Sequence, residues 1–124
     1  MPTPQNITQF EAIFGETGNN VLERIRPLSP RLVDHVYEYI AGELYADHAL
    51  DIRTRELCVV ASLASQGGLQ EQLRVHIEAA LRSGATKEDI VAVCETVGSY
   101  AGVPRALNAL FVASEVFEAW DNNG

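Results

Sequence analysis

One histidine stands out as a candidate reactive group because of the face it occupies on a predicted helix. Leucines precede His76 by seven and three residues and Ala80 follows it by four, a spacing that places all of them on one face of a helix over 69–82. An imidazole on such an apolar face is either a core histidine that hydrogen-bonds a backbone carbonyl, or a general acid or base placed where solvent is scarce. The spacing alone leaves both interpretations open.

Glu56 bears on that choice. It lies early in the preceding predicted helix, on a stripe with Val60 and Leu63. A carboxylate at the edge of a buried helix must be solvated, paired or protonated. If Glu56 meets His76 across the two helices, the pair is an acid/base couple. If it lies in the first helical turn, it simply complements the positive end of the helix dipole.

Three arginines near the same helix ends are candidates for binding an anionic substrate. Guanidinium groups hold carboxylates through paired hydrogen bonds, although exposed arginines on helix surfaces are also common. Glu78 follows Arg74 by four residues, so the side chains of Arg74 and Glu78 are expected to pair. Tyr100, beside the turn at 101–104, is a further candidate hydrogen-bond donor. The arginines are Arg53, Arg55 and Arg74.

Several other kinds of site lack their motifs. His35 and His48 are 13 residues apart, and neither has a carboxylate or cysteine at ligand spacing, which argues against a zinc site. The chain contains no phosphate-binding glycine loop and no nucleophile-elbow motif. We therefore expect neither a metal nor a cofactor.

Length, composition and charge narrow the class of protein. A chain of 124 residues with 47% hydrophobic residues suits one domain with a substantial core. Its formal charge of −8 disfavours nucleic acid and anionic membrane surfaces as partners, although a small anionic substrate can be held by local arginines. No apolar run approaches the ~20 residues that span a bilayer, and the first residues show no secretory signal. A cytoplasmic protein is expected.

The two cysteines, Cys58 and Cys94, lie 36 residues apart, and neither belongs to a C-x-x-C pair. Both fall in apolar stretches. In a chain that has its own core, this pattern predicts two reduced, buried cysteines rather than a disulfide.

Glycine, proline and capping residues divide the chain into six or seven helices with short loops and no strand. Ser29-Pro30 is an N-cap followed by proline, Thr86 and Asp89 approximate a capping box, and Gly84 suits the position after a helix end. The run 57–64 has no charged residue, as in helices of an interior or a subunit contact. The fold class is all-α. Helices are expected over 7–14, 19–25, 30–44, 52–66, 69–82, 87–97 and 104–120, with a frayed tail after them.

Five segments, in order along the chain, form a family pattern together. They are Tyr39-Ile-Ala-Gly-Glu-Leu-Tyr45, Leu50-Asp-Ile-Arg-Thr-Arg-Glu-Leu57, Leu73-Arg-Val-His76 with Ala79-Ala80-Leu81 and Gly84, Thr86-Lys-Glu-Asp-Ile90, and Tyr100-Ala-Gly-Val-Pro104 with Asn108-Ala109. This ordered set covers about residues 32–118 and resembles the carboxymuconolactone decarboxylase-like family, which shares its fold with alkylhydroperoxidase D.

The resemblance implies one helical domain over 1–124, in a subunit that forms trimers or hexamers with active sites near subunit contacts. The family has a γ-carboxymuconolactone decarboxylase branch, which acts between protocatechuate and 3-oxoadipate, and a peroxidase branch with a C-x-x-C pair shortly before the matching histidine. The peroxidase cysteines would stand seven and four residues before His76, where this chain has Leu69 and Gln72. Without those thiols the peroxidase chemistry has no reacting atom.

The resemblance therefore favours a cofactor-free lyase that decarboxylates a carboxylated lactone such as 4-carboxymuconolactone. His76 matches the family histidine, and the three arginines match its basic positions. Glu56 departs from the pattern, because the decarboxylase branch often has a small polar residue there while a glutamate resembles the peroxidase branch. This departure leaves room for another lactone or a β-keto-type acid. The alternatives are a peroxidase or antioxidant protein, and a non-catalytic oligomeric binding paralogue.

Overall fold

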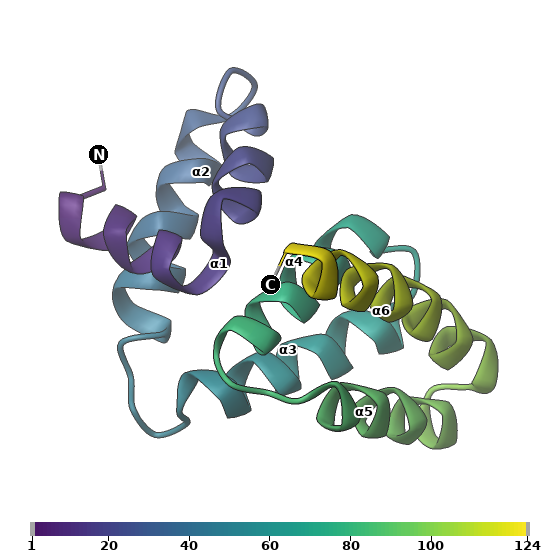
Figure 1. The fold of residues 1–124 in the computed structure, drawn as a ribbon. Helices are drawn as coiled ribbons and strands as arrows, with labels where there is room; N and C mark the ends of the chain where they lie inside the picture. Colours follow the sequence, from purple (N-terminus) through teal and green to yellow (C-terminus); the bar gives the residue numbers. More distant parts are fainter. Residues whose placement is uncertain (1, 124) are drawn as a thin grey trace. The chain divides into compact units, whose positions relative to one another are not determined.

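The computed structural model describes residues 2–123, in which all regular structure is helical, as the sequence predicts. Within these residues no helix is both long and apolar enough to cross a membrane. The chain forms two compact units that divide after Ile52, and each is described separately below as the first and the second unit. Figure 1 shows the course of the chain through both.

The first unit begins with α1 (Pro4–Ile25), which Thr3 caps by accepting a hydrogen bond from the Asn6 N–H at 3.2 Å. The two predicted N-terminal helices are joined here into one kinked helix. The kink lies at Gly15, whose φ of 66° is a left-handed conformation that interrupts the helix where the sequence predicts an end.

The predicted helix over 30–44 starts as expected but changes its geometry halfway. Ser29 Oγ accepts from the Leu32 N–H at 3.3 Å and opens α2 (Pro30–His35). From there the chain continues as the π-helix η1 (Val36–Leu44), which ends with the Tyr45 N–H bonded to the carbonyl oxygen of Ile40, five residues back. The prediction of one continuous α-helix over 30–44 is therefore wrong for its second half. The side chains that are buried are Val33, Tyr37, Ala41 and Tyr45, while Leu32 is 55% exposed.

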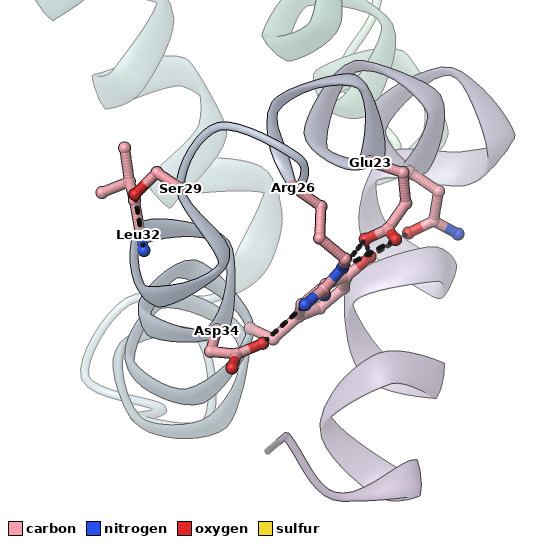
Figure 2. A network of polar contacts seen from close by, with 7 residues as sticks. Glu23, Arg26, Ser29, Leu32 and Asp34 are labelled. Atoms are coloured by element: carbon pink, nitrogen blue, oxygen red, sulfur yellow. Dashed lines mark hydrogen bonds and ion pairs between the residues drawn. The ribbon is translucent and has the colours of Figure 1, made fainter.

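Aromatic rings and one ionic network hold the first unit together. The ring of Phe10 lies 4.6 Å from that of Phe14 and 4.9 Å from that of Tyr37, centroid to centroid. At the end of α1, the Arg26 guanidinium bridges Glu23 at 2.8 Å and Asp34 at 3.0 Å, which ties α1 to α2 (Figure 2). The hydrogen bond from Arg26 lowers the pKa of the Glu23 carboxyl.

The second unit consists of α3 (Ile52–Gln66), α4 (Gln70–Arg82), α5 (Lys87–Tyr100) and α6 (Val103–Asn123). Helix α6 packs against both α4 and α5 (Figure 1). All four helices contribute side chains to one core. Fully buried members of that core are Val60, Ile77, Ala80, Ile90 and Cys94.

Two predicted helix ends in this unit are wrong. Helix α5 continues past Gly98, where a Cβ would stand 3.2 Å from the Ala106 Cβ, so the glycine serves the close approach of α6 instead of ending the helix. The expected fraying after Trp120 is wrong for 121–123, because α6 continues to Asn123 and Lys87 forms a 2.6 Å ion pair with Asp121. The last residue of the predicted tail, Gly124, lies outside the described residues.

The turn between α4 and α5 carries both predicted caps within a few residues. The N–H groups of Gly84 and Ala85 donate to the carbonyls of Leu81 and Ala80 at 3.1 and 2.9 Å, the Schellman pattern that closes a helix. Thr86 and Asp89 then exchange the two hydrogen bonds of a capping box, which begins α5.

Asp89 also connects α5 to α3. Its Oδ2 accepts from the Thr86 backbone N–H at 2.9 Å and from Arg53 Nη2 at 2.6 Å. These donors, the backbone N–H first, hold the pKa of this carboxyl below its ordinary value. A lowered pKa in the folded state means that the ionised group stabilises the fold above the ordinary value of 3.8, and that this stabilisation is lost as the pH falls through the folded value.

We therefore expect Asp89→Asn to lower the free energy of unfolding at neutral pH, and the difference from the wild type to shrink as the pH falls below 3.8. Urea unfolding followed by circular dichroism at several pH values measures both effects. Glu88→Gln, which removes a charge from the same helical turn outside the capping box, is the control. A difference independent of pH would show that the charge of Asp89 does not contribute.

Candidate functional site

The contact between Glu56 and His76 that the sequence left open is present in the second unit. His76 Nδ1 of α4 lies 2.8 Å from Glu56 Oε2 of α3. The Glu56 side chain is fully buried, and the His76 side chain is 17% exposed. The imidazole ring of His76 is therefore partly accessible to solvent, and it contacts the buried carboxyl group of Glu56.

The α3–α4 turn brings these two side chains together. Helix α3 ends at Gln66, and Gly67 and Gly68, with φ of 74° and 72°, reverse the chain into α4. One helical turn beyond Glu56 lies Val60, and one turn before His76 lies Leu73, both in the core of the unit. The pair therefore lies at the edge of that apolar core.

The helix-dipole explanation for Glu56 is wrong. Helix α3 begins at Ile52, so Glu56 falls in the second turn, and the first turn contains no acidic residue. Glu56 is moreover the only charged side chain that is buried among residues 2–123. Burial of a carboxylate is unfavourable unless a partner offsets the lost hydration, and His76 is that partner.

The contact assigns different tasks to the two ring nitrogens. An ionised carboxylate can only accept a hydrogen bond, so with Glu56 ionised it is Nδ1 of His76 that donates. Exchange of a proton with a substrate then falls to Nε2 on the other side of the ring. This arrangement fixes the tautomer and the orientation of an imidazole, as acid/base catalysis requires.

Two of the candidate arginines contact carboxylates of the protein itself. Arg53 pairs with Asp89 of α5, and Arg74 pairs with Glu115 of α6. The expected pairing of Arg74 with Glu78 is wrong, since Glu78 contacts Arg82 at 3.4 Å instead. The sequence spacing did not reveal that α6 brings a competing carboxylate to the same helix.

The remaining two candidates differ in exposure. Arg55 precedes Glu56 on α3 and is partly buried, whereas Tyr100 ends α5 and is 90% exposed. Among the described residues, Arg53, Arg74 and Tyr100 make no polar contact with the Glu56–His76 pair. No group of three or more His, Cys, Asp or Glu side chains in residues 2–123 is arranged to hold a metal ion.

A hollow near the α3–α4 turn was not predicted. It encloses about 220 Å³, including the space open to solvent at its mouth. Arg105 and Asn108 of α6 and Gln70 of α4 supply its polar groups. The one signal in the sequence was that Arg105 stands inside the last family segment, between Pro104 and Asn108. The apolar part of the lining is Leu63, Ala64, Leu69, Leu73 and Ala109.

The cysteines occupy different environments. Cys94 is fully buried in the core, and burial raises the pKa of its thiol. Cys58 is exposed, so the expectation that both are buried is wrong for this residue. It follows the buried Glu56 by two residues and therefore points to the opposite side of α3.

We expect Cys58 to react with a thiol-specific dye in the native protein and Cys94 only after unfolding, because thiolate reagents need access and a deprotonated sulfur. Absorbance of the released dye should give one thiol per chain in buffer and two in guanidinium chloride. Cys58→Ser should remove the fast reaction. Two fast thiols, or a loss of both after peroxide treatment, would contradict this assignment and favour a thiol-dependent peroxidase.

Comparison with known proteins agrees with the features above. A match to the carboxymuconolactone decarboxylase family covers residues 30–115. The chain is 28% identical over 100 residues to the 4-carboxymuconolactone decarboxylase of Acinetobacter baylyi, which is 81% of this chain and 74% of that protein. It is 30% identical over 101 residues to an uncharacterized 15.0 kDa protein of Paracoccus denitrificans, encoded in the nqo9–nqo10 intergenic region, which is 81% of this chain and 75% of that one. With most of its length matched, this chain belongs to the carboxymuconolactone decarboxylase family.

Proposed function

We propose that this protein is a cofactor-free carboxy-lyase that acts on a carboxylated, unsaturated lactone such as 4-carboxymuconolactone. His76 is the general acid/base, and Glu56 is the positioning residue that orients it. The observation that supports this most directly is the 2.8 Å contact between a fully buried carboxylate and a partly exposed imidazole. The relative from Acinetobacter baylyi named as a 4-carboxymuconolactone decarboxylase suggests the substrate class.

The reaction requires a small set of tasks. The bond between the ring carbon and the carboxylate breaks, carbon dioxide leaves, and the electron pair moves through the ring double bond toward the lactone carbonyl. The resulting dienolate must be stabilised at oxygen and protonated at carbon. One proton is taken up for each carbon dioxide released, and no electron acceptor is needed.

His76 can supply that proton through Nε2. As the proton leaves Nε2, the ring returns to the neutral form with Nδ1–H still directed at Glu56. The contact with the buried Glu56 holds the ring in one orientation during the transfer. Arg55, Arg53 and Arg74 remain proposed substrate contacts. The last two would have to exchange Asp89 and Glu115 for the substrate.

Assembly into a homo-oligomer, a trimer or hexamer, is part of this proposal. Val103, Leu107 and Phe111 follow one another at four-residue steps on α6 and are 61%, 50% and 68% exposed. An apolar stripe of this kind is typical of a surface that another subunit covers.

We further propose that the two units act as one domain and that the protein is cytoplasmic. The proposed reaction is a step of aromatic catabolism between protocatechuate and 3-oxoadipate.

His76→Asn tests the acid/base role. The amide keeps a hydrogen-bond donor beside Glu56 but cannot titrate, so we expect kcat for 4-carboxymuconolactone to fall by about 10²–10⁴-fold with the fold retained. Carbon dioxide release measures turnover, and circular dichroism checks folding. His48→Asn, which changes an exposed loop histidine in the same way, is the control. A folded His76→Asn variant with full activity would exclude the mechanism, and a wild type that binds the lactone without converting it would favour the non-catalytic paralogue.

Glu56→Gln tests the positioning role. The substitution keeps the size of the side chain and removes its negative charge, so we expect kcat to fall by about tenfold or more while KM changes little. Steady-state kinetics separate the two constants. Glu118→Gln, the same exchange at an exposed position of α6, should behave as the wild type. A change in KM alone, or in thermal stability alone, would reduce Glu56 to a structural role.

A further inference from the structure

Arg105 differs from the other cations of the second unit. Arg53, Arg74 and Lys87 each contact a carboxylate on another helix, and Arg82 contacts Glu78 on its own. Among the described residues, Arg105 contacts no carboxylate. Its one polar contact is a 3.1 Å hydrogen bond from Nη1 to the Ala101 carbonyl oxygen at the start of the same helix.

The side chain of Arg105 lies against the backbone of Gly67. A Cβ on Gly67 would stand 3.3 Å from Arg105 Nε and 3.8 Å from its Cγ. The arginine thus extends from α6 across the bare backbone of the α3–α4 turn. There it forms part of the rim of the hollow, with its side chain exposed to solvent.

The lining of the hollow suits a carboxylate attached to a small apolar body. Arg105 offers further N–H groups besides the one bonded to Ala101, and the side-chain amide of Asn108 adds a donor next to it. Leu63, Leu69 and Leu73 present apolar surface on the other side. The hollow is shallow and open to solvent, so it suits one end of a ligand, a carboxylate at the guanidinium with apolar surface beside it.

The hollow is also next to the acid/base pair. Leu73 of its wall precedes His76 by one turn of α4, and Leu69 is the residue before that helix begins. The rise of an α-helix makes the offset of Leu73 ~4.5 Å along the axis. A ligand whose carboxylate is bound at Arg105 and whose body lies along α4 therefore extends toward His76.

We propose that Arg105, assisted by Asn108, binds a carboxylate of the substrate and sets the preference for carboxylated ligands. The identity of the ligand as a lactone acid rests on the proposed function, but the binding of a carboxylate in this hollow does not. Arg105 determines specificity and has no part in the proton transfer at His76. Its loss therefore weakens binding and leaves the chemical step largely intact.

Kinetics with 4-carboxymuconolactone give the first test. For Arg105→Gln we expect KM to rise by about tenfold to a hundredfold, the usual effect of losing a hydrogen-bonded charge partner, with kcat within about threefold of the wild type. Arg105→Lys, which keeps the charge and loses the planar fork, should fall between the two. Arg82→Gln removes the same charge from a paired arginine of α4 and is the matched control. An unchanged KM for Arg105→Gln, or a loss confined to kcat, would overturn the proposal.

Binding without turnover gives the second test and separates the two proposals. Adipate, a dicarboxylate that cannot lose carbon dioxide by this chemistry, is titrated into the labelled protein while backbone amide signals are followed by NMR. We expect shifts at Gly67, Gly68 and Asn108 in the wild type and in Arg82→Gln, and their loss in Arg105→Gln. That result supports the site even if no lactone is converted. Equal binding by Arg105→Gln, or no binding by the wild type at millimolar adipate, overturns it even if turnover is observed.

Discussion

The buried carboxylate of Glu56 is the constraint around which the second unit is arranged. A carboxyl group that is buried without a partner loses its hydration, and the 2.8 Å contact with His76 offsets that loss. The contact joins α3 to α4. It also places the imidazole at the boundary between core and solvent, where a ring can exchange protons and still keep its orientation. Structure and chemistry thus depend on the same contact.

Cations elsewhere in the second unit serve the assembly of helices. The pairs Arg53–Asp89, Arg74–Glu115 and Lys87–Asp121 each join helices that are distant in sequence. Exposed pairs of this kind contribute about 0–1 kcal/mol each, so their effect on stability is small. Each of these pairs already occupies its cation with a carboxylate of the protein, which a substrate anion would have to displace. Arg105, at the hollow beside the α3–α4 turn, has no carboxylate partner among the described residues.

Features that depend on residues close together in the sequence were predicted better than features that depend on contacts between helices. The caps at Ser29, Thr86 and Gly84 were predictable because each depends on neighbours within a few residues. The inward face of His76 followed from helical periodicity. The partner of Arg74, the exposure of Cys58 and the hollow at Arg105 were not predictable, since each depends on which surface another helix covers. The contact between Glu56 and His76 lies between these cases. Helical periodicity predicted the face of the helix on which each residue lies, but not the distance between the two side chains.

The π-helical segment η1 makes the first unit sensitive to the length of its chain. Removal of one residue from this segment would restore α-helical geometry and turn everything after it by about 100° around the helix axis. Tyr45, whose ring packs edge-on against Phe14 at 5.6 Å, would leave the aromatic core, while Tyr37 before it would stay. Substitutions along 36–44 leave this register intact, whereas a single insertion or deletion does not. Homologues should therefore differ in residue type along this segment more readily than in its length.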